Sequence, residues 1–127
     1  MSKNSKVYSY NKLKELIEQS RSKQPKIGTN TTARFLYDKR IAIRLHYTDI
    51  IIVDENNNYQ LFSGGWNTTT TRDRLNHYSP AYIKSVKGEM FIRKDFYEGT
   101  KKDNLIPFRE GIFINSEGEV IPRIFQV

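Results

Sequence analysis

The sequence predicts an α+β fold: an antiparallel, strand-rich meander, sandwich or small barrel with an N-terminal helix and one short helix after a Gly-Gly-Trp junction. Short runs rich in Ile, Val, Tyr and Phe recur between turn residues from residue 31 onward. Apolar residues at helical spacing occur at 10–22, and a threonine-rich helix start follows Gly64-Gly65-Trp66. With 127 residues we expect one domain, with a flexible start at 1–9 and a strand-rich core at 31–127.

The N-terminal helix is predicted from a single apolar stripe. Its members lie three and four residues apart: Tyr10, Leu13, Leu16 and Ile17. Ser9 or Asn11 can serve as the N-cap, and the helix should end near residue 21 or 22, ahead of Pro25. A basic amphipathic helix could read DNA or lie on a membrane surface. The stripe is short, which favours packing on a small sheet.

Alternation predicts the next elements. Strands are expected at 31–37 and 40–47, joined by Asp38-Lys39. In the second, the apolar positions from Ile41 to Tyr47 face inward, and Arg40, Arg44 and His46 share an outer face. That face is either a basic stripe or an ordinary surface strand.

The remaining strands are predicted from apolar runs between turn signals. A central strand at 49–54 pairs through a turn at 55–58 with a strand at 59–63. Further strands are expected at 81–86 and 89–93, joined by Lys87-Gly88, and at 112–115 and 120–125. The linker 23–30 and the polar stretch 95–104 are expected to be loops.

The positive charge is concentrated in the first third. The net charge is +7, but residues 1–47 hold eleven Lys or Arg against three acids, and residues 48–127 hold ten against eleven. Such asymmetry is typical of a surface that faces a polyanion, most often nucleic acid. It is equally compatible with a solvated basic surface that aids solubility.

Composition and motifs argue against catalysis. The chain has no cysteine, no lysine-containing phosphate loop and no paired carboxylates, and its two histidines lie in different elements. We therefore expect no enzyme activity, no metal and no cofactor. No apolar run has the length of a signal or a membrane span, so the expected location is the cytoplasm and no membrane partner is expected.

Binding is better supported, at the segment from Ser63 to Asn76. It holds the only tryptophan, a glycine pair, four threonines and two arginines. A helix start that carries hydroxyls, cations and an aromatic ring is suited to contact phosphate groups or single-stranded nucleic acid. In the alternative interpretation, Trp66 is buried in the core and the threonines only cap the helix. The candidate nucleic-acid-binding residues are Lys12, Lys14, Arg40, Arg44, His46, Trp66, Asn67, Thr70, Thr71, Arg72 and Arg74.

Two stretches, 45–50 and 61–76, resemble a family of small, largely uncharacterised proteins of tailed bacteriophages and prophages. Those proteins pair a His-x-Thr element, here His46-Tyr47-Thr48, with a Gly-Trp-x-Thr-x-Thr-Thr-Lys-x-Arg-x-Asn-like segment, here 65–76 with Arg72 in place of the lysine. A Phe-x-x-Gly turn at 108–111 also matches. The resemblance covers roughly residues 40–114 and implies a viral setting and a shared fold.

Two functions follow as expectations. The first is a basic phage accessory protein that binds nucleic acid without catalysis, mainly through backbone phosphates, with affinity that falls as salt rises. The second is a protein-interaction module, a host-factor-binding or anti-defence protein or a minor virion component, using some of the fifteen Tyr and Phe as anchors.

Overall fold

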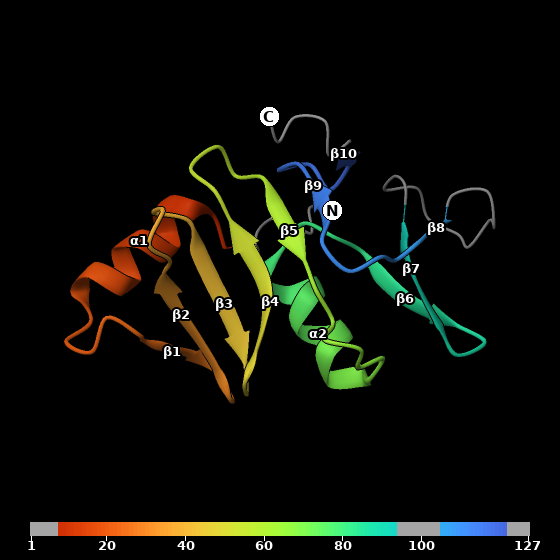
Figure 1. Ribbon diagram of the computed structural model, residues 1–127, viewed down its shortest axis with the longest axis horizontal. Coiled ribbons are helices and arrows are strands. Elements are labelled where there is room, and N and C mark those ends of the chain that lie inside the picture. The colour runs from red at the N-terminus through yellow and green to blue at the C-terminus, as the bar shows by residue number, and fades with distance from the viewer. Residues whose placement is uncertain (1–7, 94–104, 122–127) are drawn as a thin grey trace.

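The computed structural model describes residues 8–93 and 105–121 (Figure 1). The helices are α1 (Tyr10–Gln19) and α2 (Thr69–Tyr78). The strands are β1 (Lys26–Gly28), β2 (Thr31–Phe35), β3 (Ile41–Leu45), β4 (Thr48–Val53), β5 (Tyr59–Leu61), β6 (Ile83–Val86), β7 (Glu89–Arg93), β8 (Leu105–Pro107), β9 (Ile112–Ile114) and β10 (Val120–Ile121).

The strands form two antiparallel sheets. Seven strands pair in the order β1-β2-β3-β4-β5-β9-β10, so the first five make a meander, and β6, β7 and β8 form a separate sheet. Helix α2 lies between the sheets and contacts β4 and β6 (Figure 1). The structure confirms the α+β, strand-rich class; the large sheet is open, so the predicted alternative of a closed barrel is wrong.

Helix α1 begins where the sequence predicts. Ser9 is the N-cap, and its Oγ accepts a hydrogen bond from the Lys12 N–H at 3.1 Å. The helix ends at Gln19, earlier than expected: Ser20 is extended, its N–H donates to the Ile17 carbonyl at 3.1 Å, and the Lys23 ammonium donates to the Glu18 carbonyl at 2.8 Å. The apolar stripe packs into the core as predicted, with three buried side chains: Tyr10, Leu13 and Ile17.

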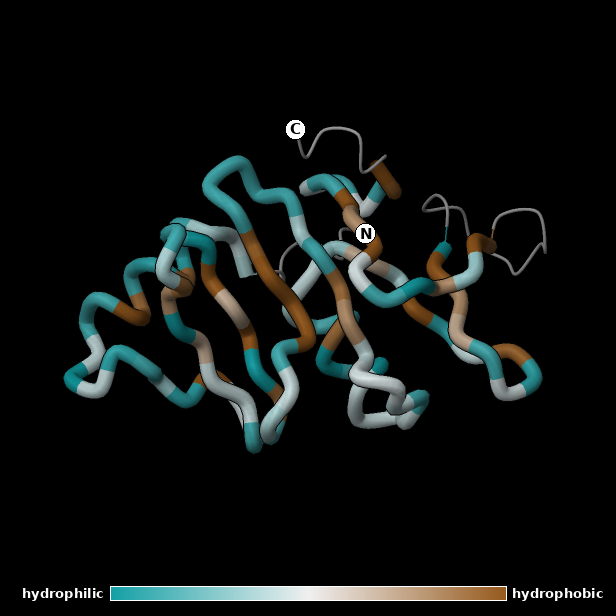
Figure 2. The backbone as a smooth tube through the Cα atoms, in the orientation of Figure 1, coloured by the Kyte–Doolittle hydropathy of each residue, from teal (hydrophilic) through white to brown (hydrophobic). Residues whose placement is uncertain are grey.

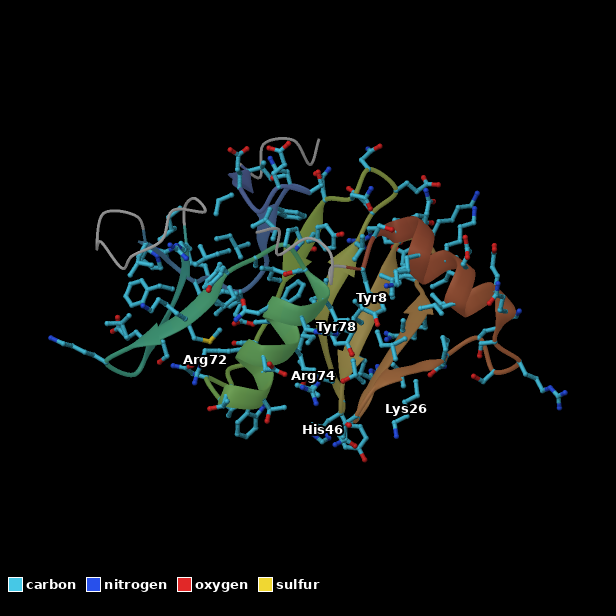
Figure 3. The ribbon with its side chains drawn as sticks, turned by 180° about the vertical axis from the view of Figure 1, so that it is seen from behind. Tyr8, Lys26, His46, Arg72, Arg74 and Tyr78 are labelled. Atoms are coloured by element: carbon cyan, nitrogen blue, oxygen red, sulfur yellow. The ribbon has the colours of Figure 1, made fainter. Side chains whose placement is uncertain are left out.

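Both helices cover the same face of the large sheet (Figure 3). The residues beneath them are aliphatic and fully buried, and Figure 2 shows the apolar character concentrated along the central strands. The core is continuous across helices and sheets: it includes Leu13 of α1, Ile43 and Ile51 of the central strands, Leu75 of α2 and Ile92 of β7. No helix in the described part of the chain is long and apolar enough to cross a membrane.

Three buried tyrosines tie this core to the backbone around it. The hydroxyl of Tyr10 donates to the Lys39 carbonyl at 2.7 Å, that of Tyr59 to the Tyr8 carbonyl at 3.0 Å, and that of Tyr78 to the Ile27 carbonyl at 3.0 Å. Burial raises the pKa of all three phenols, to about 12 for Tyr59. Each therefore satisfies its polar atom inside the core.

The predicted strand 40–47 requires correction. Strand β3 is shorter, and Arg40 lies in the turn before it, with its Nε 2.8 Å from a carboxylate oxygen of Asp38. His46 and Tyr47 form the turn to β4, so Tyr47 is exposed instead of facing inward. Arg40 and His46 thus lie at opposite ends of β3, and the expected stripe with Arg44 does not form.

Other boundaries differ by a few residues. Strand β2 ends at Phe35 and not at 37, β6 begins at Ile83 and not at 81, and strands β1 and β8 fall where no strand was predicted. Both unpredicted strands are three residues long, too short to show alternation. The loop expected at 95–104, residues 1–7 of the expected flexible start and the end of the strand expected at 120–125 lie outside the described residues.

A bulge in β4 changes which side chains face the core. Ile43 pairs with Ile51 but Arg44 pairs with Asp49, which leaves Ile50 as the extra residue. Ile50 and Ile51 are therefore both buried, and Asp49 lies with Arg44 on the face away from the helices. Without the bulge the period of two would place Asp49 on the core side.

Asp49 joins two arginines on that outer face. Arg34 donates two hydrogen bonds to the carboxylate, at 2.7 and 2.8 Å, and the Nε of Arg44 lies 3.3 Å away. Hydrogen bonds from Arg34 are the main cause that lowers the pKa of Asp49, with the charges of both arginines adding to the effect. Arg34 comes from the neighbouring strand β2 and shares the Asp49 carboxylate with Arg44, a grouping that alternation within one strand could not reveal.

We predict that Asp49→Asn lowers the free energy of unfolding at neutral pH by about 1–2 kcal/mol, because a charge-assisted bidentate pair is lost. The arginines lower the pKa of Asp49 in the folded state. The stabilisation that Asp49 provides is therefore fully present above its unfolded-state pKa of about 4, and it is lost as pH falls through the folded-state pKa. Urea unfolding of the wild type and of Asp49→Asn, at several pH values from 7 to 2, measures how the free energy of unfolding of each depends on pH. A difference between wild type and variant that persists undiminished at low pH would contradict this account.

Candidate functional site

An open cleft of about 510 Å³ lies at one end of the large sheet, between the β3–β4 turn and the start of α2. It brings together two separate segments of the chain, residues 45–50 and 63–71. Its floor is apolar and its walls carry hydroxyls and rings. The lining residues are Leu45, His46, Tyr47, Thr48, Ile50, Ser63, Trp66, Thr68, Thr70 and Thr71.

The β3–β4 turn forms one wall. His46 adopts a φ of 56°, and its backbone N–H donates to the carbonyl of Asn30 in the β1–β2 turn at 2.8 Å. Histidine tolerates this left-handed conformation better than most residues. The two-residue turn leaves the Tyr47 side chain 93% exposed beside the cleft.

The glycine pair forms the other wall. Gly64 and Gly65 both have positive φ, 67° and 87°, and the Trp66 N–H donates to the Ser63 carbonyl at 3.1 Å. The predicted sharp turn is therefore confirmed. The alternative that Trp66 plugs the core is wrong, because the side chain is 63% exposed and lines the cleft.

Glu110 holds the glycine turn in place. Its carboxylate accepts hydrogen bonds from the backbone N–H groups of Ser63, at 2.8 Å, and Gly64, at 3.0 Å, and from the hydroxyl of Ser63. Gly111 follows with a φ of 84°, and its N–H donates to the Leu61 carbonyl at 2.7 Å. The turn 108–111 therefore supports the wall of the cleft, a role that the sequence analysis did not assign to Glu110.

Helix α2 starts at the cleft. Thr68 is the N-cap, and its Oγ1 lies 3.1 Å from the Thr71 N–H and 3.0 Å from the Thr71 hydroxyl. Thr71 is buried, whereas Thr69 and Thr70 are exposed. The run of threonines thus divides into a cap, made by Thr68 and Thr71, and two exposed hydroxyls, of which that of Thr69 accepts a hydrogen bond from Arg72 at 3.4 Å.

The asparagines of this segment hold α2 to the small sheet. The Asn67 amide donates to the Gly88 carbonyl at 3.0 Å, in the turn between β6 and β7. The Asn76 amide donates to the Ile83 carbonyl at 3.0 Å and its Oδ1 accepts from the Ile83 N–H at 2.6 Å. Asn67, predicted as a contact residue, therefore has a structural role.

The two predicted arginines differ in their surroundings. Arg74 points toward the β1–β2 turn, where it donates to the Thr31 hydroxyl at 3.2 Å and the Thr29 carbonyl at 3.4 Å, and it forms an ion pair with Asp73 at 2.7 Å. Arg72 donates to the Asn67 side chain, and no carboxylate of the described residues lies within ion-pair distance of it. Arg72 thus has no described counter-ion, and it directly follows Thr71 of the cleft lining without lining the cleft itself.

The remaining predicted residues lie elsewhere. The Lys12 ammonium on α1 sits 4.2 Å from the centre of the Tyr8 ring, and Lys14 is exposed on the same helix. Arg44 is engaged with Asp49 on the face away from the helices. Figure 3 shows Lys26, which was not predicted, along one edge of the molecule with His46, Arg72 and Arg74.

Of the predicted residues, the structure brings four to the cleft: His46, Trp66, Thr70 and Thr71. It adds Tyr47, which strand alternation had placed facing inward. The turn at Tyr47 contains no Gly, Asn or Asp, so no turn signal was available. No group of three or more potential metal ligands of the His, Asp and Glu type occurs in residues 8–93 and 105–121.

A family model described as Kyanoviridae Gp96 protein matches residues 10–115. The match spans most of the chain, so the chain belongs to this family of bacteriophage proteins, and the phage-type family expected from the sequence is confirmed. It also includes α1, which the resemblance had left out. No curated protein and no solved structure shows a significant match.

We predict that Gly64→Ala destabilises the protein more than Gly65→Ala. Both positions have positive φ, so each alanine carries a conformational cost of about 1–2 kcal/mol. At Gly64 the added Cβ would also lie 2.8 Å from the Thr48 methyl, whereas nothing lies within 4 Å at Gly65. Urea unfolding of both variants measures the difference; equal losses would show that contact with Thr48 is unimportant.

Proposed function

We propose that this member of the Kyanoviridae Gp96 family is a basic accessory protein that binds nucleic acid without catalysis, mainly through backbone phosphates. One observation carries the proposal: His46 and the segment from Trp66 to Thr71 meet at one open cleft, which four of the predicted contact residues line. The surrounding edge carries cations, and the ten residues that line the cleft include no acid.

The charges near the cleft support a polyanionic ligand. Arg72 and Lys26 have no described acidic partner, and the exposed hydroxyls of Thr69 and Thr70 can donate to phosphate oxygens. The Arg74 guanidinium donates to Thr31 and Thr29 of the β1–β2 turn, so its role is mainly structural. Phosphate contacts of this kind position a ligand without reading its sequence.

A protein-interaction module is the second candidate. It is favoured by the exposed rings at both ends of β3, since Tyr37 is 99% exposed and Tyr47 is 93% exposed. Aromatic side chains dominate the energetics of protein interfaces. A host or virion protein that stays bound at high salt and after nuclease treatment would support this candidate over the first.

We predict that affinity for oligonucleotides falls as salt rises and that Arg72→Gln reduces the slope of log affinity against log salt by about one unit. Titrations followed by anisotropy of a labelled oligonucleotide, at several salt concentrations, measure this slope. The matched control is Arg40→Gln, which removes the same charge at the opposite end of β3.

The two variants separate a local contact from general charge attraction. If Arg40→Gln changes the slope as much as Arg72→Gln, the protein attracts polyanions through its net charge and the cleft is not the site. If neither titration shows binding, the nucleic-acid proposal fails. Unfolding midpoints of both variants serve as a check that the fold is retained.

A further inference from the structure

We infer that the cleft accepts an unpaired base of a single strand, stacked against Tyr47 and Trp66; this choice of ligand rests on the proposed function. The proposal above requires only contacts with phosphates, which a duplex and a single strand both present. The two rings add a contact that a duplex cannot use.

The exposure of the rings is the first support. Tryptophan is highly buried on average in folded proteins and tyrosine is partly buried, because water contact with their large apolar faces is unfavourable. Here the only tryptophan of the chain is 63% exposed and Tyr47 is 93% exposed. Both line one cleft although they come from different hairpins, so their exposure is concentrated at one place.

The construction of the walls is the second support. Glu110 holds the turn before Trp66 with hydrogen bonds to Ser63 and Gly64, and the Asn30 carbonyl holds the turn before Tyr47 through the His46 N–H. The rings are therefore presented by turns whose backbones are fixed from outside. A rigid platform loses little conformational entropy when a ligand stacks on it.

The chemistry of the lining is the third support. Leu45 and Ile50 provide an apolar floor, and threonine and serine hydroxyls surround it. The volume of about 510 Å³ falls within the range of about 300–1,000 Å³ that small-ligand sites occupy. An apolar floor with hydroxyls at the side suits a flat heterocycle whose edges carry hydrogen-bonding groups.

Single-stranded nucleic acid is the ligand that matches both rings and charge. In a duplex the faces of the bases are covered by their neighbours, and only their edges are accessible in the grooves. An unpaired base offers a free face, and every base stacks on an aromatic ring without regard to sequence. The nearby cations without a described counter-ion, Arg72 next to Thr71 of the lining and Lys26, are available to its phosphates.

The first measurement uses Trp66 as a probe, since it is the only tryptophan in the chain. Full-length protein is titrated with a single strand of about ten nucleotides, as DNA and as RNA, with the matching duplex and with an abasic strand of the same length. We expect quenching and tighter binding with the base-containing strands. The DNA and RNA arms show whether the sugar matters.

Tyrosine variants provide the second measurement. Tyr47→Ala should weaken binding of the base-containing strand by about 5- to 150-fold, the effect of one lost stacking contact, and Tyr47→Phe should keep it. Binding of the abasic strand should change little. Tyr37→Ala is the matched control, because Tyr37 is equally exposed but lies in the turn at the other end of β3.

The outcomes separate this inference from the function on which it rests. If the abasic strand and the duplex bind as tightly as the single strand and Tyr47→Ala has no effect, base stacking is overturned while phosphate binding stands. If Tyr47→Ala and Tyr37→Ala weaken binding equally, the cleft is not the stacking site. If no nucleic acid binds, both proposals fail.

Discussion

The bulge at Ile50 is the constraint on which the rest of the structure depends. One extra residue in β4 places Ile50 beside Ile51 in the core and turns Asp49 to the opposite face, where Arg34 and Arg44 hold it. The same shift puts Ile50 in the floor of the cleft. Thr48 then stands against Gly64, close enough that no larger residue fits there without adjustment. The geometry of the cleft and the polar outer face of the sheet thus share one origin.

The segment after the glycine pair combines two kinds of residue. Asn67, Asn76 and Arg74 bind backbone or side-chain groups of neighbouring elements and join α2 to both sheets. Trp66 lines the cleft, and the Arg72 side chain donates to Asn67 and Thr69 of its own segment. Structural residues and surface residues therefore alternate within this segment. Substitution of its polar residues is expected to lower stability at some positions and to change only the exposed surface at others.

Much of the fold was predictable because its signals are local. Helix α1, the central strand, the glycine turn and the cap of α2 each depend on spacing or on a residue type within a few positions. The candidate site was predictable only in part. His46, Trp66, Thr70 and Thr71 were identified from their types, but Tyr47 was assigned to the core and Glu110 to no role. Their positions depend on a turn without the usual turn residues and on a contact between residues 47 apart in sequence.

The sequence by itself determined the secondary-structure class, the position of the basic charge along the chain and the sharp turn before Trp66, because propensity, charge and glycine conformation are properties of single residues. Tertiary structure decided which of these features meet. It separated Arg40 from His46 along β3, directed Arg74 inward and Trp66 outward, and joined two distant turns into one cleft. The physical reason is register: pairing across strands, shifted at Ile50 by the bulge, decides which strand side chains face the core, and no pattern within one strand specifies it.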